Sequence, residues 1–252
     1  MLALPSAQQK VSNPRIQAPH EMIEEYHRQQ LHPGQPLRDL MNEKAFPSIT
    51  KALAWGNLST SIAAKKIIED TVSVSLRQLC SETFIGDLLH IYCGEKLTKI
   101  NPQLLHSFLA CENTSWKFLY RIPHFWSSDM WTVKETINKT LGTYFEIPRA
   151  EREGNHFINS TEDELRRCGL NSDEVARTDM LHLGAITGNN YNVAFCIMSH
   201  IVHSPDLRDR LRKESQPGLG NGVLNMDYLV EKFPLLEAVV NEILRFIYGA
   251  HY

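Results

Sequence analysis

One long helix in the second half of the chain constrains the fold more than any other feature of the sequence. Asn171 with Glu174, or Ser172 alone, can cap its first turn. Asp173 adds negative charge there, close to exposed N–H groups. Pro205 ends the helix, because the residue before a proline disfavours the helical conformation. A helix of about thirty residues is about 45 Å long, so we expect a mostly helical core built around it.

A polar break interrupts this otherwise apolar helix. The break contains Gly188, Asn189 and Asn190. The part that follows is apolar nearly all the way round, which is typical of a helix in a core: Val193, Ala194, Phe195, Ile197, Met198, Ile201 and Val202. Buried amides without hydrogen bonds cost about 1–3 kcal/mol each. The break is therefore either satisfied by neighbouring helices or faces a ligand.

The composition is that of an ordinary globular protein. The chain has 252 residues, of which 42% are hydrophobic and 22% charged, so it can bury a sizeable core as one domain or two. Its net charge of -3 argues against a nucleic-acid partner held by phosphate contacts. Five cysteines without a C-x-x-C pair indicate reduced intracellular thiols. Because no apolar run approaches the ~20 residues that span a bilayer, we expect no membrane anchor in this chain.

The sequence divides into a short lead-in and one helical region. Residues 1–36 are rich in Gln, Pro and His and are expected to be poorly ordered. Residues 37–252 form the helical domain, with no strand-like alternation. Apolar spacing, prolines and caps predict helices, besides the long one, over residues 62–76, 79–92, 102–109, 129–144 and 234–247.

Two smaller patterns have simple interpretations. Glu242 and Arg245 stand three residues apart on the last predicted helix. By themselves they indicate a solvent-face ion pair worth about 0.3–0.5 kcal/mol. His200 and His203 have the same spacing, but no carboxylate at ligand spacing accompanies them, so no metal site is predicted.

The order of three segments resembles the middle of a cytochrome P450. The segments are Gly188-Asn189-Asn190 within the long helix, residues 203–214 beginning His-Ser-Pro-Asp-Leu, and residues 233–245 reading Phe-Pro-Leu-Leu-Glu-Ala-Val-Val-Asn-Glu-Ile-Leu-Arg. Residues 115–123 and 144–148 also resemble a fungal branch related to prostacyclin synthase and the sterol 7-hydroxylases. The resemblance covers residues 75–246.

The resemblance implies a partial cytochrome P450 fold, mostly α, that runs through the helix with the E-x-x-R pair. The implied activity is that of a heme-thiolate monooxygenase acting on a hydrophobic small molecule, with secondary metabolite biosynthesis as one setting. The implied partners are that substrate and an electron-donating reductase. The usual family location is the endoplasmic reticulum membrane. The aromatic residues around Pro123 could line a substrate entrance, or pack in a core or interface.

Individual residues take roles by the same resemblance. Ala185 and Gly188 would face the heme, and Asn189 and Asn190 would form the oxygen-facing turn. Glu242 and Arg245 would be the E-x-x-R pair, a buried structural element that helps to fix the heme-bearing region.

The sequence departs from the family pattern at two places. Most members carry an acidic residue followed by Thr at the oxygen-facing turn, to deliver protons to dioxygen, where this chain has Asn189 and Asn190. An amide donates hydrogen bonds but supplies no titratable proton, and the related isomerase branch lacks the acid–Thr pair too, so oxygenation and isomerisation both stay open.

The second departure concerns the heme ligand. The family's Cys-ligand loop is not found after Arg245, and Cys196, on the long helix, is expected to be a buried small hydrophobe. We therefore expect a truncated chain without the axial Cys ligand. The alternative is a non-catalytic helical remnant or interaction protein that binds no heme.

Overall fold

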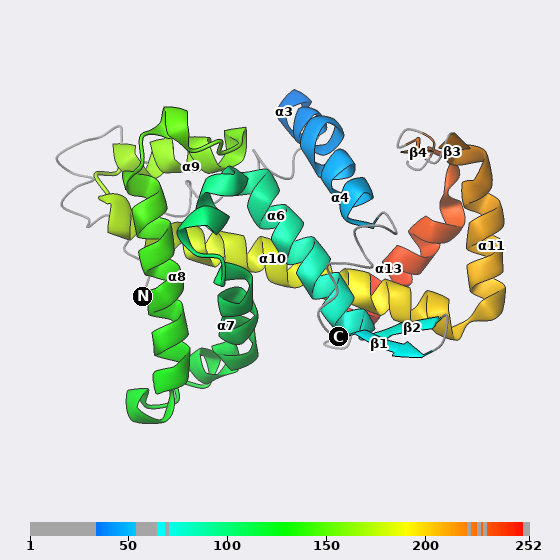
Figure 1. Cartoon of the computed structure of the whole chain (residues 1–252), viewed down its shortest axis with the longest axis horizontal. Coiled ribbons are helices and arrows are strands. Elements are labelled where there is room, and N and C mark those ends of the chain that lie inside the picture. The colour runs from blue at the N-terminus through cyan, green and yellow to red at the C-terminus, as the bar shows by residue number, and fades with distance from the viewer. Residues whose placement is uncertain are drawn as a thin grey trace. The chain divides into compact units, whose positions relative to one another are not determined.

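The computed structural model describes residues 34–53, 65–68, 71–220, 223–225, 228 and 231–248 (Figure 1). The predicted poorly ordered lead-in, residues 1–36, lies outside these ranges except for its last three residues, and it stays a prediction. Two compact units divide the chain. Unit 1 contains Met1–Leu53 and Glu82–Gly188, and unit 2 contains Ala54–Ser81 and Asn189–Tyr252.

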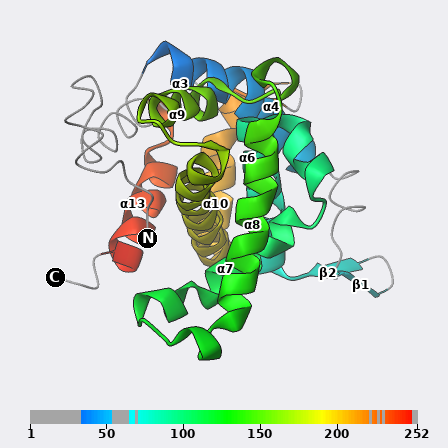
Figure 2. The ribbon, with the colours of Figure 1, turned by 90° about the vertical axis from the view of Figure 1, so that its left-hand side faces the viewer.

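Unit 1 is made of helices, which Figures 1 and 2 show around the first half of α10. In chain order its elements are α3 (Gln35–Asp39), the π-helix η1 (Leu40–Ala45), α4 (Phe46–Leu53), most of α6 (Leu76–Ile100), α7 (Leu104–Leu119), the 3-10 turn η2 (His124–Trp126), α8 (Ser128–Glu146), the 3-10 turn η3 (Arg149–Glu151), α9 (His156–Arg167) and the first half of α10 (Ser172–His203). The prediction of a mostly helical protein is confirmed.

The start of α10 is fixed by a reciprocal capping box. The Asn171 backbone N–H donates to Glu174 Oε2 at 2.9 Å, and the Glu174 N–H donates to Asn171 Oδ1 at 3.1 Å. Two exposed donors of the first turn are thereby satisfied. Ser204 caps the next helix, α11 (Pro205–Ser215), by accepting from the Leu207 N–H. The predicted limits of the long helix are therefore confirmed.

The core of unit 1 lies where α6, α7, α8, α9 and α10 bring their apolar faces together. Its fully buried side chains are Ile85, Leu89, Leu97, Leu104, Ile137, Leu141, Tyr144, Phe157, Leu165, Val175 and Leu183. α6 bends at Gly94, where φ is +69°. An added Cβ there would lie 2.5 Å from the Cβ of Glu153, so this bend depends on glycine.

Unit 2 contains two short hairpins and the later helices. β1 (Lys65–Ile68) pairs antiparallel with β2 (Thr71–Val74), and β3 (Leu219–Gly220) pairs antiparallel with β4 (Val223–Leu224). The second half of α10, α11, the 3-10 turn η4 (Gln216–Gly218) and α13 (Pro234–Tyr248) complete its described elements. Among the described residues of this unit, the buried apolar side chains are Cys80, Tyr191, Leu211, Phe233 and Ile243.

The predicted helix over residues 62–76 is wrong, because β1 and β2 occupy most of it. β-branched side chains such as Ile67, Val72 and Val74 are stiff at χ1 and fit a pleated strand better than a helix. The prediction counted apolar spacing without weighing residue type. α9 was not predicted, since its few apolar residues are spread among charged ones.

The burial predicted for the second half of α10 is also wrong. Val193, Ala194 and Phe195 are half-buried, and Val202 is 55% exposed. Apolar composition therefore overestimated how much of this helix other elements cover. Among the described residues, no helix is long and apolar enough to cross a membrane.

Candidate functional site

The polar break of α10 is resolved by local hydrogen bonding and exposure. Thr187 is buried, and its hydroxyl donates to the Leu183 carbonyl oxygen at 2.7 Å. Asn189 and Asn190 are exposed. Water can therefore satisfy both amides, and the break carries no desolvation penalty.

Small residues line α10 just before the asparagines. Ala185 is exposed, and a Cβ added at Gly184 would meet no described residue within 4 Å. Among the residues that the structure describes, a Cβ added at Gly188 would meet the Glu112 carboxyl group alone, at 3.7 Å, which is an ordinary contact. Glycine inside a helix costs about 0.5–1 kcal/mol relative to alanine. Neither glycine is thus explained by packing in unit 1, and together with Ala185 they leave a smooth strip where a flat group could lie.

A buried acid that the sequence analysis missed occupies the opposite side of the same helix. Asp179 is 0% exposed, and it falls within the buried stripe of Val175, Ala176, Leu183 and Thr187. Among the described residues, neither of its carboxylate oxygens has a hydrogen-bond partner. The missed signal was a charged residue at a core position of the helical repeat.

A second buried acid lies nearby but is fully compensated. Glu162 accepts from Arg152 at 2.6 Å, from Arg149 at 3.1 Å and from Arg166 at 3.3 Å. The Arg152 guanidinium carbon also stands 5.1 Å from the centre of the Tyr144 ring. This network links η3, α8 and α9. Removing one of its arginines would leave part of the buried Glu162 charge uncompensated, which is strongly destabilising.

Four of the five cysteines do not fit the axial ligand of a heme-thiolate centre. All are thiols; Cys80, Cys93 and Cys168 are buried, and Cys111 and Cys196 are half-buried. Burial raises the thiol pKa of Cys80, Cys93, Cys111 and Cys168. A metal ligand must be the deprotonated thiolate, so burial opposes the required state in these four. No group of three metal-ligating side chains occurs in the described ranges.

The histidines near Cys196 are engaged within their own helix. The His200 ring nitrogen Nδ1 stands 3.0 Å from the Cys196 carbonyl oxygen, and His203 Nδ1 stands 2.8 Å from that of Ser199. Both rings therefore lie against the surface of α10, with Nδ1 in contact with a backbone carbonyl oxygen of the same helix.

Glu242 and Arg245 form a two-point ion pair on α13. Arg245 Nε donates to Glu242 Oε2 at 2.8 Å, and its terminal nitrogen donates to Oε1 at 2.5 Å. The side chains are 62% and 70% exposed. The hydrogen bond from Arg245 lowers the pKa of Glu242. The buried structural role that the resemblance implies for this pair stays a prediction.

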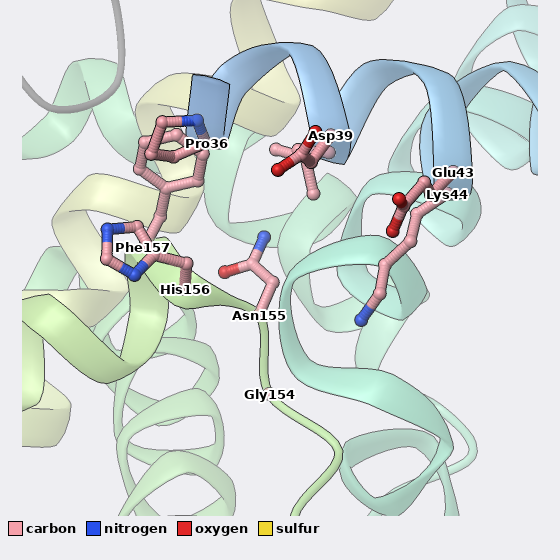
Figure 3. Close-up of a pocket in the computed structure, with 9 residues that line it drawn as sticks. Pro36, Asp39, Glu43, Lys44, Gly154, Asn155, His156 and Phe157 are labelled. Carbon is pink, nitrogen blue, oxygen red and sulfur yellow. The ribbon is translucent and has the colours of Figure 1, made fainter. Parts of the chain in front are cut away.

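A cleft of about 370 Å³ lies between the α3–η1 segment and the start of α9 (Figure 3). Asp39 and Glu43 line it from one side, and Asn155, His156 and Phe157 line it from the other. Asn155 Oδ1 caps α9 by accepting from the Ile158 N–H at 3.0 Å. The cleft is open and has a mixed lining, and it brings none of the sequence-predicted site residues together.

An exposed group of large side chains, here called the aromatic tip, surrounds the connection between α7 and α8. Its members are 48% to 75% exposed: Trp116, Phe118, Leu119, Tyr120, Phe125 and Trp126. Between residues 116 and 134, Lys117, Arg121 and Lys134 are opposed by Asp129 alone, so this stretch carries a formal charge of +2. Its exposure argues against the core packing that the sequence analysis left open, and the substrate entrance and the interface both stay predictions.

Comparison with known proteins gives one clear result. The family model of Cytochrome P450 matches residues 71–251, which is most of the chain and includes α6 through α13. No curated protein matches the sequence.

Replacing Gly188 by alanine should stabilise unit 1 by about 0.5–1 kcal/mol, because the helix gains propensity and the new Cβ meets only an ordinary contact. Urea unfolding measures the change. Gly94→Ala is the matched control and should lose more than about 1 kcal/mol, because φ is positive there and the Cβ would clash. A loss of stability in Gly188→Ala would show that α10 is packed more tightly at this point than the structure has it.

Proposed function

Because the chain belongs to the cytochrome P450 family, we propose that it functions in a heme-thiolate monooxygenase acting on a hydrophobic small molecule. Secondary metabolism is the proposed setting, and the branch resembling prostacyclin synthase and the sterol 7-hydroxylases is the proposed relative. The setting and the branch are proposed from the resemblance of residues 115–123 and 144–148 to that branch. An electron-donating reductase is the proposed partner.

The strip of Gly184, Ala185 and Gly188 is the observation that carries this proposal. Two glycines within a helix weaken it, and packing in unit 1 requires neither of them. A flat cofactor lying against the helix would explain both, since a Cβ would hold it away. We assign the heme-facing role to Ala185 and Gly188 on this ground. Heme, when bound, would supply the oxidising chemistry.

The chain's own cysteines set a limit on that assignment. Burial opposes the thiolate state in four of them, and Cys196 lies on α10 beyond the polar break. The proposal therefore requires an iron ligand other than these four thiols. Asn189 and Asn190 are assigned to the oxygen-facing turn, where their amides can orient a bound molecule by hydrogen bonds but cannot donate a titratable proton. Glu242 and Arg245 are assigned the structural role of the E-x-x-R pair, which helps to fix the heme-bearing region.

The reduced, carbon-monoxide-bound absorption spectrum tests this proposal on two samples. The 252-residue chain, expressed with heme precursor, should lack the red-shifted Soret band of thiolate ligation. The native product of the gene, isolated with antibodies against this chain, should show that band. A band in the 252-residue chain that Cys196→Ala abolishes and Cys111→Ala leaves intact would make Cys196 the ligand. Absence of heme from both samples would overturn the enzyme proposal.

The aromatic tip favours a second candidate function, that of an interaction protein without heme. Trp and Tyr side chains suit the boundary between water and lipid, because each has an apolar body and a polar edge. The basic residues around them match the negative charge of anionic headgroups, although the whole chain is acidic at -3. In this candidate the tip binds a lipid surface. The same contact would account for a location at the endoplasmic reticulum membrane in the enzyme proposal.

Flotation with phosphatidylserine-containing vesicles tests the role of the tip. The double variant Phe125→Ser/Trp126→Ser should lose about tenfold or more in partitioning, because burying each large apolar side chain is worth about 1.5–3 kcal/mol. Leu181→Ser is the control, since Leu181 is exposed on α10 away from the tip. If the double variant floats as well as the unaltered chain, the tip is not the lipid contact.

A further inference from the structure

Asp179 stands where the helical repeat of α10 calls for an apolar side chain. The residues before and after it on the same side, Val175, Ala176 and Leu183, are all buried in the core of unit 1. An ionised carboxylate in such a place loses its hydration and requires a cation or several hydrogen bonds in return.

The charges around Asp179 do not supply that compensation. Among the described residues, both of its oxygens lack hydrogen-bond partners. Arg152, the cation that interacts with Cys93 and Tyr144 of this cluster, is bound to Glu162 at 2.6 Å and lies over the Tyr144 ring. The arginines of the cluster are thus bound to Glu162, and a negative charge at Asp179 would stand nearby without a partner.

Titratable groups on three other helices interact with Asp179. Tyr92 and Cys93 face it from α6, and Tyr144 faces it from α8. Glu162 faces it from α9 and repels its negative charge. Arg152, which follows η3, carries a positive charge that opposes the rise in the pKa of Cys93 and of Tyr144.

The uncharged groups stay uncharged over the ordinary pH range. Burial raises the pKa of Tyr92 to about 12 and raises the pKa of Cys93 well above its ordinary value. Burial also raises the pKa of Tyr144, and its hydroxyl has no hydrogen-bond partner among the described residues. Asp179 is therefore the member of the cluster that exchanges a proton near neutral pH.

We propose that Asp179 is a proton-operated latch, which holds residues 172–188 of α10 in the core of unit 1 as a neutral carboxylic acid and releases them when it ionises. The polar break and the latch share one helix, because Gly188 lies nine residues after Asp179, about half a turn round the helix axis. Ionisation of the latch would loosen the helix that carries the proposed heme-facing strip. The latch itself rests only on contacts within unit 1 and stands whether or not heme is bound.

The direction of the pH effect follows from proton linkage. Burial, with a smaller contribution from Glu162, raises the pKa of Asp179 from 3.8 to about 8. Between these values the folded chain holds a proton that the unfolded chain has lost. The contribution of Asp179 to stability is therefore complete below about pH 4, falls as the pH rises, and is gone above about pH 8.

Two measurements on the 252-residue chain test the latch. Infrared spectra of the unaltered chain at pH 6 should contain the carbonyl band of a protonated carboxylic acid that is missing in Asp179→Asn and disappears by pH 9. Urea unfolding between pH 5.5 and 8.5 should show that the folding equilibrium constant falls about tenfold or more relative to that of Asp179→Asn. Asp173→Asn is the matched control, because Asp173 is exposed on the same helix and paired with Arg177 at 2.9 Å.

The result expected for the control is a pH dependence like that of the unaltered chain. Equal pH dependence in the unaltered chain and Asp179→Asn, or no protonated-acid band at pH 6, would overturn the proposal. Should Asp179→Asn fail to fold, the band of the unaltered chain and its loss by pH 9 still decide the outcome.

Discussion

The burial of one stripe of α10 within unit 1 is the interaction on which the rest of the structure depends. Val175, Ala176 and Leu183 lie in the core with the apolar faces of α6, α7, α8 and α9. That contact fixes the rotation of the helix about its axis. Because the stripe faces inward, Ala185 and Asn189 face outward, and the strip of small residues stays accessible. The positions of Ala185 and Gly188 are thus a consequence of core packing several residues earlier on the same helix.

The ends of the helices could be predicted from the sequence because local chemistry determines them. Asn171 and Glu174 satisfy each other's backbone groups without help from the rest of the chain, and Pro205 ends α10 by its own geometry. Burial could not be predicted in the same way. The apolar residues after Asn192 indicate a core helix, yet their exposure depends on which other elements reach them. The β1–β2 hairpin was missed because apolar spacing was weighed without β-branching at Ile67, Val72 and Val74.

The site shows the same division between local and collective properties. The small strip at Gly184 and Gly188 and the E-x-x-R spacing are visible in the sequence as patterns. The burial of the cysteines and the isolation of Asp179 are not, because they arise where several helices meet. The place of Asp179 in the helical repeat indicates that it is buried. Only the surrounding core shows that Arg152 pairs with Glu162 and that, among the described residues, the Asp179 oxygens have no hydrogen-bond partner.

Hydrogen exchange along α10, followed by mass spectrometry, tests the account most directly. If one buried stripe holds the first half of the helix, amides from residues 175–187 should exchange only through opening of unit 1 and be strongly protected. Amides from residues 193–203, whose side chains are half-buried or exposed, should exchange much faster. Uniform protection along the whole helix would contradict the account, since it would mean that both halves are held by packing of equal strength.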